Sequence, residues 1–130
     1  MSNLAQTLTI EGGDKIPAKD VRAFIRKLVR AIGGPERYLA QAVTMSESQL
    51  SRMRSRKKGS FREQTIHPLI RIAILVDEAS KVFTDEGVKQ WIKRPNPYLN
   101  DVPPIFCLRS DKELEKVLSV LAAVGYGFPA

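Results

Sequence analysis

Three polar residues in a short stretch, Ser48, Gln49 and Arg52, have side chains that can read the edges of nucleic-acid bases. Gln and Arg can form paired hydrogen bonds with adenine and guanine edges, and Ser can donate or accept one. Leu50 and Met53 lie among them at helical spacing. The pattern predicts a helix that buries these two apolar side chains and turns the three polar ones outward toward a duplex.

Lys and Arg side chains near this stretch can contact phosphates, which fix the orientation of a protein on DNA without specifying sequence. The candidates are Arg26, Arg30, Arg54, Arg56, Lys57, Lys58 and Arg62. Residues 1–62 hold thirteen Lys and Arg against five Asp and Glu, a net charge of +8, whereas residues 63–130 hold eight against nine, a net charge of −1. Basicity confined to one half favours a polyanion-binding module. The alternative is a solvated basic hairpin without a partner.

The elements that must position these residues have the pattern of a helix-turn-helix. Glu36 to Val43 predicts the first helix, and the capping-box pair Ser46 and Gln49 predicts a second helix through about Arg56. Such a motif needs apolar anchors on both helices and a small residue where they cross. These are Leu39, Ala40, Val43, Met45, Leu50 and Met53.

Thr44 departs from the motif at the turn. The motif usually has Gly there, because the backbone tends to adopt a positive φ that costs free energy for other residues. We therefore expect the turn to be wider than usual.

Apolar periodicity predicts further helices on both sides of the motif. No segment alternates polar and apolar residues for long enough to predict a strand. The expected fold class is therefore all-α, with an N-terminal three-helix unit followed by a second small all-α domain. The further helices are expected at Val21–Ile32, Pro68–Phe83, Asp85–Lys93 and from Ser110 to about Gly125.

Three segments are expected along the chain. Residues 1–17 contain Gly12, Gly13 and Pro17 without a helical period and are expected to be a flexible arm. Residues 18–65 are the expected helix-turn-helix domain, and residues 66–130 the second domain. The apolar helix at the start of that second domain is typical of a core or dimer interface.

Other chemistry is poorly supported by the sequence. There are no paired carboxylates on one predicted face, no Gly-rich phosphate loop and no nucleophile beside a base, so we expect no enzyme activity and no cofactor. The single Cys107 is expected to be a buried apolar residue, His67 a residue at a helix start and Trp91 part of the core. No metal site, disulfide, membrane span or leader is expected, which places the protein in the cytoplasm.

The order of residues after position 80 resembles the toxin-binding domain of the Xre/MbcA/ParS antitoxin family. The resemblance covers about residues 66–130, with the Xre-like helix-turn-helix before it. Lys112 departs from it, because relatives often have Gly soon after the acidic residue. The residues that carry it are Val82-Phe83, Trp91-Ile92, Arg94-Pro95-Asn96, Leu99, Pro103-Pro104, Leu108, Asp111, Val117, Leu121 and Tyr126-Gly127.

The resemblance implies a dimeric, all-α antitoxin of a type II toxin–antitoxin pair. Its expected partners are operator DNA at its own promoter, a second copy of itself and a toxin of the RES or ParT type, which consumes NAD or uses it for ADP-ribosylation. The toxin would be blocked at its active site by the C-terminal part of the antitoxin. The alternative is a free-standing helix-turn-helix regulator whose C-terminal half only dimerises.

The end of the chain suits this role. The residues expected to contact the toxin are Tyr126, Gly127, Phe128, Pro129 and Ala130. Tyr and Phe are large, rigid contact groups that can fill a cleft. The alternative is that both rings fold back onto the protein's own core.

Overall fold

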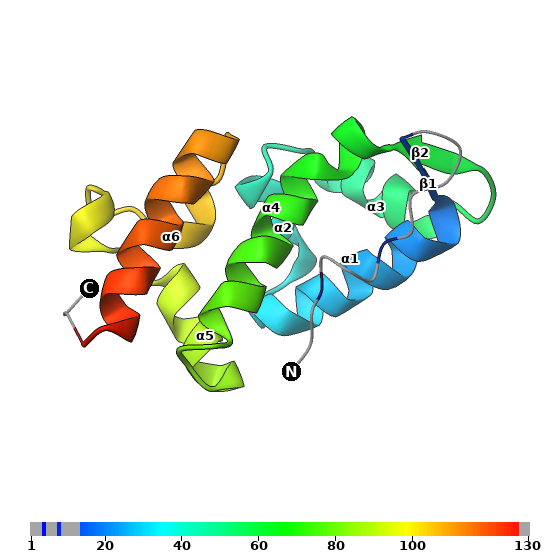
Figure 1. Ribbon diagram of the computed structural model, residues 1–130. Helices are drawn as coiled ribbons and strands as arrows, with labels where there is room; N and C mark the ends of the chain where they lie inside the picture. Colours follow the sequence, from blue (N-terminus) through cyan, green and yellow to red (C-terminus); the bar gives the residue numbers. More distant parts are fainter. Residues whose placement is uncertain (1–3, 5–7, 9–13, 128–130) are drawn as a thin grey trace.

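The computed structural model of the protein describes Leu4, Leu8 and residues 14–127. Within them the chain forms six α-helices, two 3₁₀ turns in the loop before the last helix, and one two-stranded sheet (Figure 1). The all-α fold class is confirmed. The elements are β1 (Lys15–Pro17), α1 (Ala18–Ile32), α2 (Glu36–Ala42), α3 (Glu47–Ser55), β2 (Ser60–Arg62), α4 (Glu63–Ala79), α5 (Asp85–Lys93), η2 (Pro97–Leu99), η3 (Pro104–Phe106) and α6 (Asp111–Gly125).

The first helix, α1, is built on the predicted apolar stripe. Val21, Phe24, Ile25 and Leu28 are all fully buried, as their helical spacing requires. Gly33 ends the helix in the left-handed conformation, with φ 68°, and its N–H donates to the Val29 carbonyl. A Cβ is disfavoured in that conformation, so glycine is the residue that closes this helix most easily.

The turn of the helix-turn-helix is tight, not wide as the sequence suggested. Thr44 itself adopts the positive φ, at 54°. Its N–H donates to the Gln41 carbonyl at 3.2 Å, and the Met45 N–H donates to the Ala40 carbonyl at 2.9 Å. These two bonds form the Schellman arrangement that commonly ends a helix, here with Thr in the usual place of Gly.

The short sheet is a correction to the expected absence of strands. In β1, Ile16 is fully buried and pairs with Phe61 in β2. Three-residue strands are too short to show alternation in a sequence, so their pairing leaves no local signal. The expected flexible arm, residues 1–17, therefore includes a strand. Leu4 is also buried, whereas residues 1–3, 5–7 and 9–13 lie outside the described part of the chain.

The long apolar helix, α4, begins earlier and ends earlier than its sequence pattern suggested. It starts at Glu63, where the backbone N–H donates to the Asp14 carbonyl at 2.6 Å beside the sheet. Pro68 was expected at its start but lies in the second turn, where the ring removes a helical N–H. The helix ends at Ala79 and not at Phe83.

The Pro-rich loop between α5 and α6 is organised by Asn96. Its side chain is buried, and its Oδ1 accepts the Tyr98 N–H at 2.9 Å. Its backbone carbonyl accepts the Asp101 N–H at 2.9 Å. Asn100 and Asp101 turn the chain with positive φ values of 57° and 61°. The loop is thereby fixed in place before α6 begins.

One hydrophobic core runs through both halves of the molecule. Helix α4 packs against α1 on one side and against α6 on the other, and α1 also packs against α3 and α5 (Figure 1). Leu28, Leu75 and Val117 belong to this core although they come from three different helices. The expected domain boundary at residues 65 and 66 falls inside the first turn of α4.

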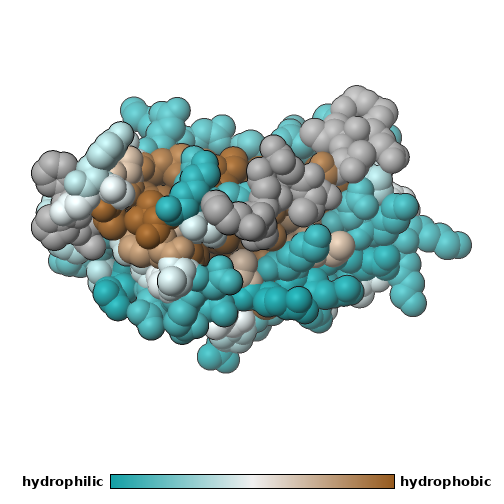
Figure 2. Space-filling view, turned by 60° about the horizontal axis from the view of Figure 1, so that its bottom comes forward, coloured by the Kyte–Doolittle hydropathy of each residue, from teal (hydrophilic) through white to brown (hydrophobic). Residues whose placement is uncertain are grey.

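The surface of the molecule differs between its two halves. Figure 2 shows a face on which apolar side chains gather toward the C-terminal half, whereas the N-terminal half is mostly hydrophilic. No helix among the described residues has the length and apolar character that crossing a membrane requires.

Candidate nucleic-acid interface

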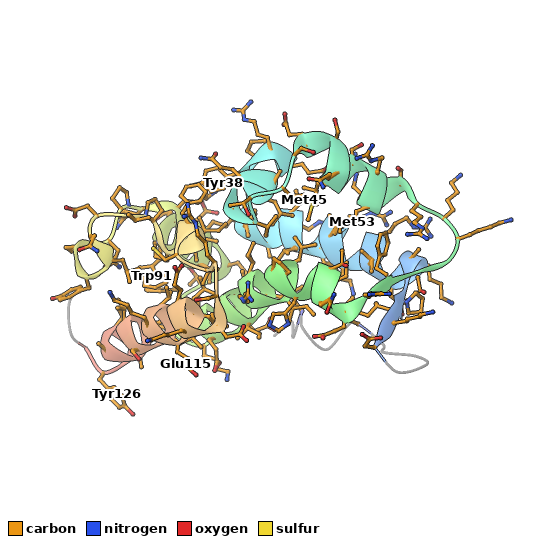
Figure 3. All side chains as sticks on the ribbon, turned by 90° about the horizontal axis from the view of Figure 1, so that it is seen from above. Tyr38, Met45, Met53, Trp91, Glu115 and Tyr126 are labelled. Atoms are coloured by element: carbon orange, nitrogen blue, oxygen red, sulfur yellow. The ribbon has the colours of Figure 1, made fainter. Side chains whose placement is uncertain are left out.

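Helix α3 presents the polar face that the sequence predicted. Its start is fixed by Ser46, whose hydroxyl oxygen accepts the Gln49 N–H at 3.0 Å. Leu50 and Met53 are buried in the core (Figure 3 labels Met53). Arg52 is exposed on the opposite side and forms no ion pair within the described part of the chain. Its guanidinium can therefore reach a ligand without losing a protein partner.

Ser48 and Gln49 are exposed beside Arg52, but Gln49 already has a structural task. Its Oε1 accepts the Ser46 N–H at 3.1 Å and the Ser46 hydroxyl at 3.3 Å. A bidentate contact with adenine uses both the oxygen and the nitrogen of the amide. Such a contact would have to open the cap of α3. A single hydrogen bond donated by the Gln49 Nε2 would leave the cap closed.

The structure brings two predicted phosphate contacts from distant parts of the sequence together. Arg26 and Val29 of α1, Glu36 of α2 and Arg54 of α3 line one hollow. The Arg54 guanidinium pairs with the Glu36 carboxylate at 2.5 Å, so a phosphate would have to compete with that carboxylate. Arg26 and its neighbour Arg30 are exposed on the outer face of α1.

The remaining predicted cations follow α3. The Arg56 guanidinium stacks 4.7 Å from the centre of the Phe61 ring, and its Nε donates to the Lys58 carbonyl at 3.1 Å. Arg56 therefore helps to hold the loop. Lys57, Lys58 and Arg62 are exposed on this loop and on β2, where their side chains can meet phosphates.

Two residues of α2 were not among the predicted contacts. Arg37 and Gln41 are both exposed, and their four-residue spacing places them on one face of this first helix of the motif. The sequence could have indicated that Arg37 is exposed, because it stands directly after Pro35 and Glu36 in the first turn of that helix.

At the other end of the molecule, the described part of the predicted toxin-contacting tail is exposed. Tyr126 is 84% exposed, so its ring does not fold back onto the core (Figure 3). Gly127 follows with a φ of 89°. Phe128, Pro129 and Ala130 lie outside the described residues. Tyr98, in the loop before α6, is a second exposed aromatic side chain, at 56%, that the sequence did not single out.

Trp91 and Cys107 are structural residues in this fold. Trp91 is buried, and its ring centre lies 5.8 Å from that of Phe83. Cys107 is half-buried, less than predicted, and its thiol lies 3.6 Å from the Pro103 carbonyl. Burial, followed by the nearby Glu113 carboxylate, raises the pKa of this thiol above its ordinary value. A raised pKa disfavours the reactive thiolate.

His67 does not stand at a helix start, contrary to the prediction. It lies in the second turn of α4, where its Nε2 is 2.9 Å from an Asp111 carboxylate oxygen and its Nδ1 is 3.3 Å from a Glu63 carboxylate oxygen. Arg71 also donates to Asp111, at 2.8 Å. These contacts connect α4 to the start of α6. Across the described residues, no three His, Cys, Asp or Glu side chains gather in a way that could hold a metal ion.

Comparison with known proteins identifies the fold. No family model matches the chain, and no curated protein matches it either. A chain in the crystal structure of the M. tuberculosis MbcT–MbcA toxin–antitoxin complex is similar, with a TM-score of 0.62 and 19% sequence identity. The likeness covers 84% of this chain and 96% of that chain. It therefore extends over both halves of the molecule.

Proposed function

We propose that this protein is an antitoxin that neutralises a partner toxin and represses its own promoter. The observation that carries the proposal is the likeness in fold, over nearly all of the chain, to a component of a toxin–antitoxin complex. The name MbcA occurs both in that complex and in the antitoxin family that residues 66–130 resemble. The sequence pattern and the fold therefore support the same class of function by separate routes.

The repressor activity is assigned to the N-terminal half. Ser48 and Arg52 are exposed on α3, and cations surround this helix on α1 and on the loop after α3. Exposed polar residues on the second helix of the motif suit contact with base edges, and the cations suit contact with phosphates. Dimeric proteins with such motifs bind two half-sites, so a homodimer would read a palindromic operator.

The neutralising activity is assigned to the C-terminal half. Tyr126 is almost fully exposed at the end of α6, where a large, rigid ring can enter a cleft of another protein. The family resemblance points to a RES- or ParT-type toxin that acts on NAD. In this proposal the tail, Tyr126–Ala130, covers the toxin active site.

A co-expression experiment with two matched variants tests both assignments. The protein encoded beside this chain's gene is expressed as the toxin, with growth and promoter activity as the two readouts. Deletion of Tyr126–Ala130 should abolish growth rescue but leave repression, because the deleted tail begins at an exposed residue and α3 is untouched. Arg52→Ala should weaken repression by about 5- to 160-fold, as expected for the loss of about 1–3 kcal/mol of base recognition, and leave growth rescue intact.

Two results would contradict these assignments. If the wild-type chain relieves no toxicity of the neighbouring protein and purifies without it, the chain is a free-standing regulator. If growth rescue survives the deletion, the tail is not the blocking element.

A further inference from the structure

Three cations of the near-neutral C-terminal half gather where α5 packs against the end of α1. Lys89, Lys93 and Arg94 line one hollow together with Gly33, the residue that caps α1. None of the three forms an ion pair with any residue that the structure describes. Gln90 and one carboxylate, Glu86, complete the hollow. Its electrostatic character is therefore cationic.

The two lysines are positioned by the glycine pair between α1 and α2. A Cβ on Gly33 would lie 2.6 Å from Cδ of Lys89, so the absence of a side chain lets the lysine stem lie against the backbone. The Lys93 ammonium nitrogen lies 4.0 Å from the corresponding position on Gly34. Stems packed in this way keep the charged ends at the surface and lower the entropy lost when a ligand is bound.

These cations continue a line that begins at the helix-turn-helix. Arg26, Arg30 and Gly33 follow one another on one face of α1, because residues three or four apart on a helix are neighbours. The hollow at Arg26 also includes Arg54 and Ser55 from the end of α3. The line thus runs from α3, along α1, to α5. Its acids are Glu36, which is already paired with Arg54, and Glu86.

The length of this line suits a nucleic-acid backbone. The seven helical steps from Arg26 to Gly33 span about 10 Å of helix axis. One DNA strand carries a phosphate for about every 3.4 Å of its axis, so about three phosphates fit along it. A protein partner would be expected to bury an apolar centre. The residues that line the α5 hollow are instead mainly charged or polar.

We propose that Lys89, Lys93 and Arg94 form a second phosphate-contacting surface, which extends the DNA backbone contacts of the helix-turn-helix onto the C-terminal half. This inference rests on the DNA-binding part of the proposed function. The three cations position the protein and add affinity on any sequence, because phosphate contacts carry no base information. The half of the protein assigned to the toxin thereby also takes part in holding DNA.

The test is the salt dependence of DNA binding. The triple variant Lys89→Gln, Lys93→Gln, Arg94→Gln is compared with the wild-type chain by fluorescence anisotropy between 50 and 200 mM NaCl. The probes are the duplex upstream of the chain's gene and a scrambled duplex. Loss of three phosphate contacts should reduce the slope of log K against log salt by about 2.7. Between 50 and 200 mM NaCl the triple variant should therefore lose about 40-fold less affinity than the wild-type chain loses. The preference for the upstream duplex should remain unchanged.

A control variant removes the same charge elsewhere. Arg109→Gln, Lys112→Gln, Lys116→Gln lowers the net charge by the same three units at the start of α6, so a general field effect would flatten both plots equally. Equal flattening, or a triple variant with the wild-type slope, would overturn the inference while DNA binding by the wild-type chain still stands. So would loss of growth rescue with unchanged DNA binding, which would assign the α5 surface to the toxin. Failure of the wild-type chain to bind either duplex would instead remove the repressor assignment itself.

Discussion

At the scale of single residues, Thr44 is the most unusual residue of the helix-turn-helix. It adopts a left-handed backbone conformation, with a φ of 54°, while the hydrogen bonds around it are those of an ordinary helix end. That conformation costs about 1–2 kcal/mol for a residue with a Cβ. Interactions around the turn must offset this cost, and the hydrogen bond from the Met45 N–H to the Ala40 carbonyl is one of them.

Thr44→Gly is therefore expected to stabilise the protein. Relief of the backbone conformation is partly offset by the greater freedom of glycine in the unfolded chain, which leaves a net gain of about 0.5–1 kcal/mol. Thermal unfolding followed by circular dichroism measures it as a rise of about 2–5 °C. Thr44→Ala is the matched control, because it also loses the hydroxyl bond to the Val43 carbonyl but keeps a Cβ. If both variants unfold at the same temperature, the backbone conformation is not the cause.

Residue chemistry was predictable where it depends on near neighbours in the sequence. The pair Ser46 and Gln49 predicted a capping box, and the structure contains it. The same sequence stretch also predicted that Gln49 reads bases. Spacing alone does not show that these two tasks compete for one amide oxygen. Similarly, Lys89 and Lys93 were not identified as site residues because only the packing of α5 on α1 brings them to Gly33 and Gly34.

At the scale of elements, α4 and α6 are connected at one end by a charged cluster. The carboxylate of Asp111, the first residue of α6, contacts the side chains of Arg71 and His67 from α4. The hydrogen bond from Arg71, and after it the contact with His67, lowers the pKa of the Asp111 carboxyl below its usual value. The carboxylate also lies at the positive end of the α6 dipole.

The pH dependence of stability follows from the direction of this shift. Because the pKa of Asp111 is lower in the folded than in the unfolded protein, its charge stabilises the fold above the unfolded pKa of about 3.9. This contribution is lost as the pH falls through the folded-state pKa. Asp111→Asn should therefore lower the urea midpoint at pH 7, and its difference from the wild-type midpoint should shrink below about pH 4.

The size of this effect is expected to be small, because the Asp111 side chain is 70% exposed and solvent screens its contacts. Glu115→Gln is the control, since Glu115 is an exposed carboxylate on the same helix (Figure 3) without an ion pair in the described structure. Equal midpoints for the two variants at pH 7 would show that the cluster contributes nothing particular.

Elements were predictable where a long apolar period or a strong cap marks them. The helix at Asp85–Lys93 begins and ends as expected, and α1, α2 and α3 differ from the prediction by a few residues. The strands β1 and β2 were missed because each holds three residues, and their pairing joins positions more than forty residues apart. The early start of α4 was missed for the same reason, since the Asp14 carbonyl that receives its first N–H comes from the segment before β1.

At the scale of the whole molecule, the shared core predicts that both halves unfold together. Leu121 of α6 is buried in the same core as Leu28 of α1. Leu121→Ala should therefore destabilise the protein by about 2–5 kcal/mol and lower the midpoint reported by Trp91 fluorescence and by helical circular dichroism equally. Hydrogen exchange of the α3 amides should accelerate as well, although α3 lies far from the mutation in sequence.

The control for this experiment is Ser119→Ala, an exposed position on the same helix. Separate transitions for the two probes, or unchanged exchange in α3, would show that the halves are independent domains. A division of the chain at residues 65 and 66, as the sequence suggested, would then describe the energetics better than the shared core does.

The central place of α4 also has a consequence for the order of events during synthesis. Helix α3 is complete once Ser55 has been added, but the core that joins the two halves, where α1 packs against α4 and α4 against α6, is complete only when those later helices have been made. At about 5–20 residues per second, the ribosome needs roughly 4–14 seconds to travel from Ser55 to Gly125. A nascent chain would spend that time with an incomplete core. The two halves of the molecule would therefore reach their final packing at nearly the same moment.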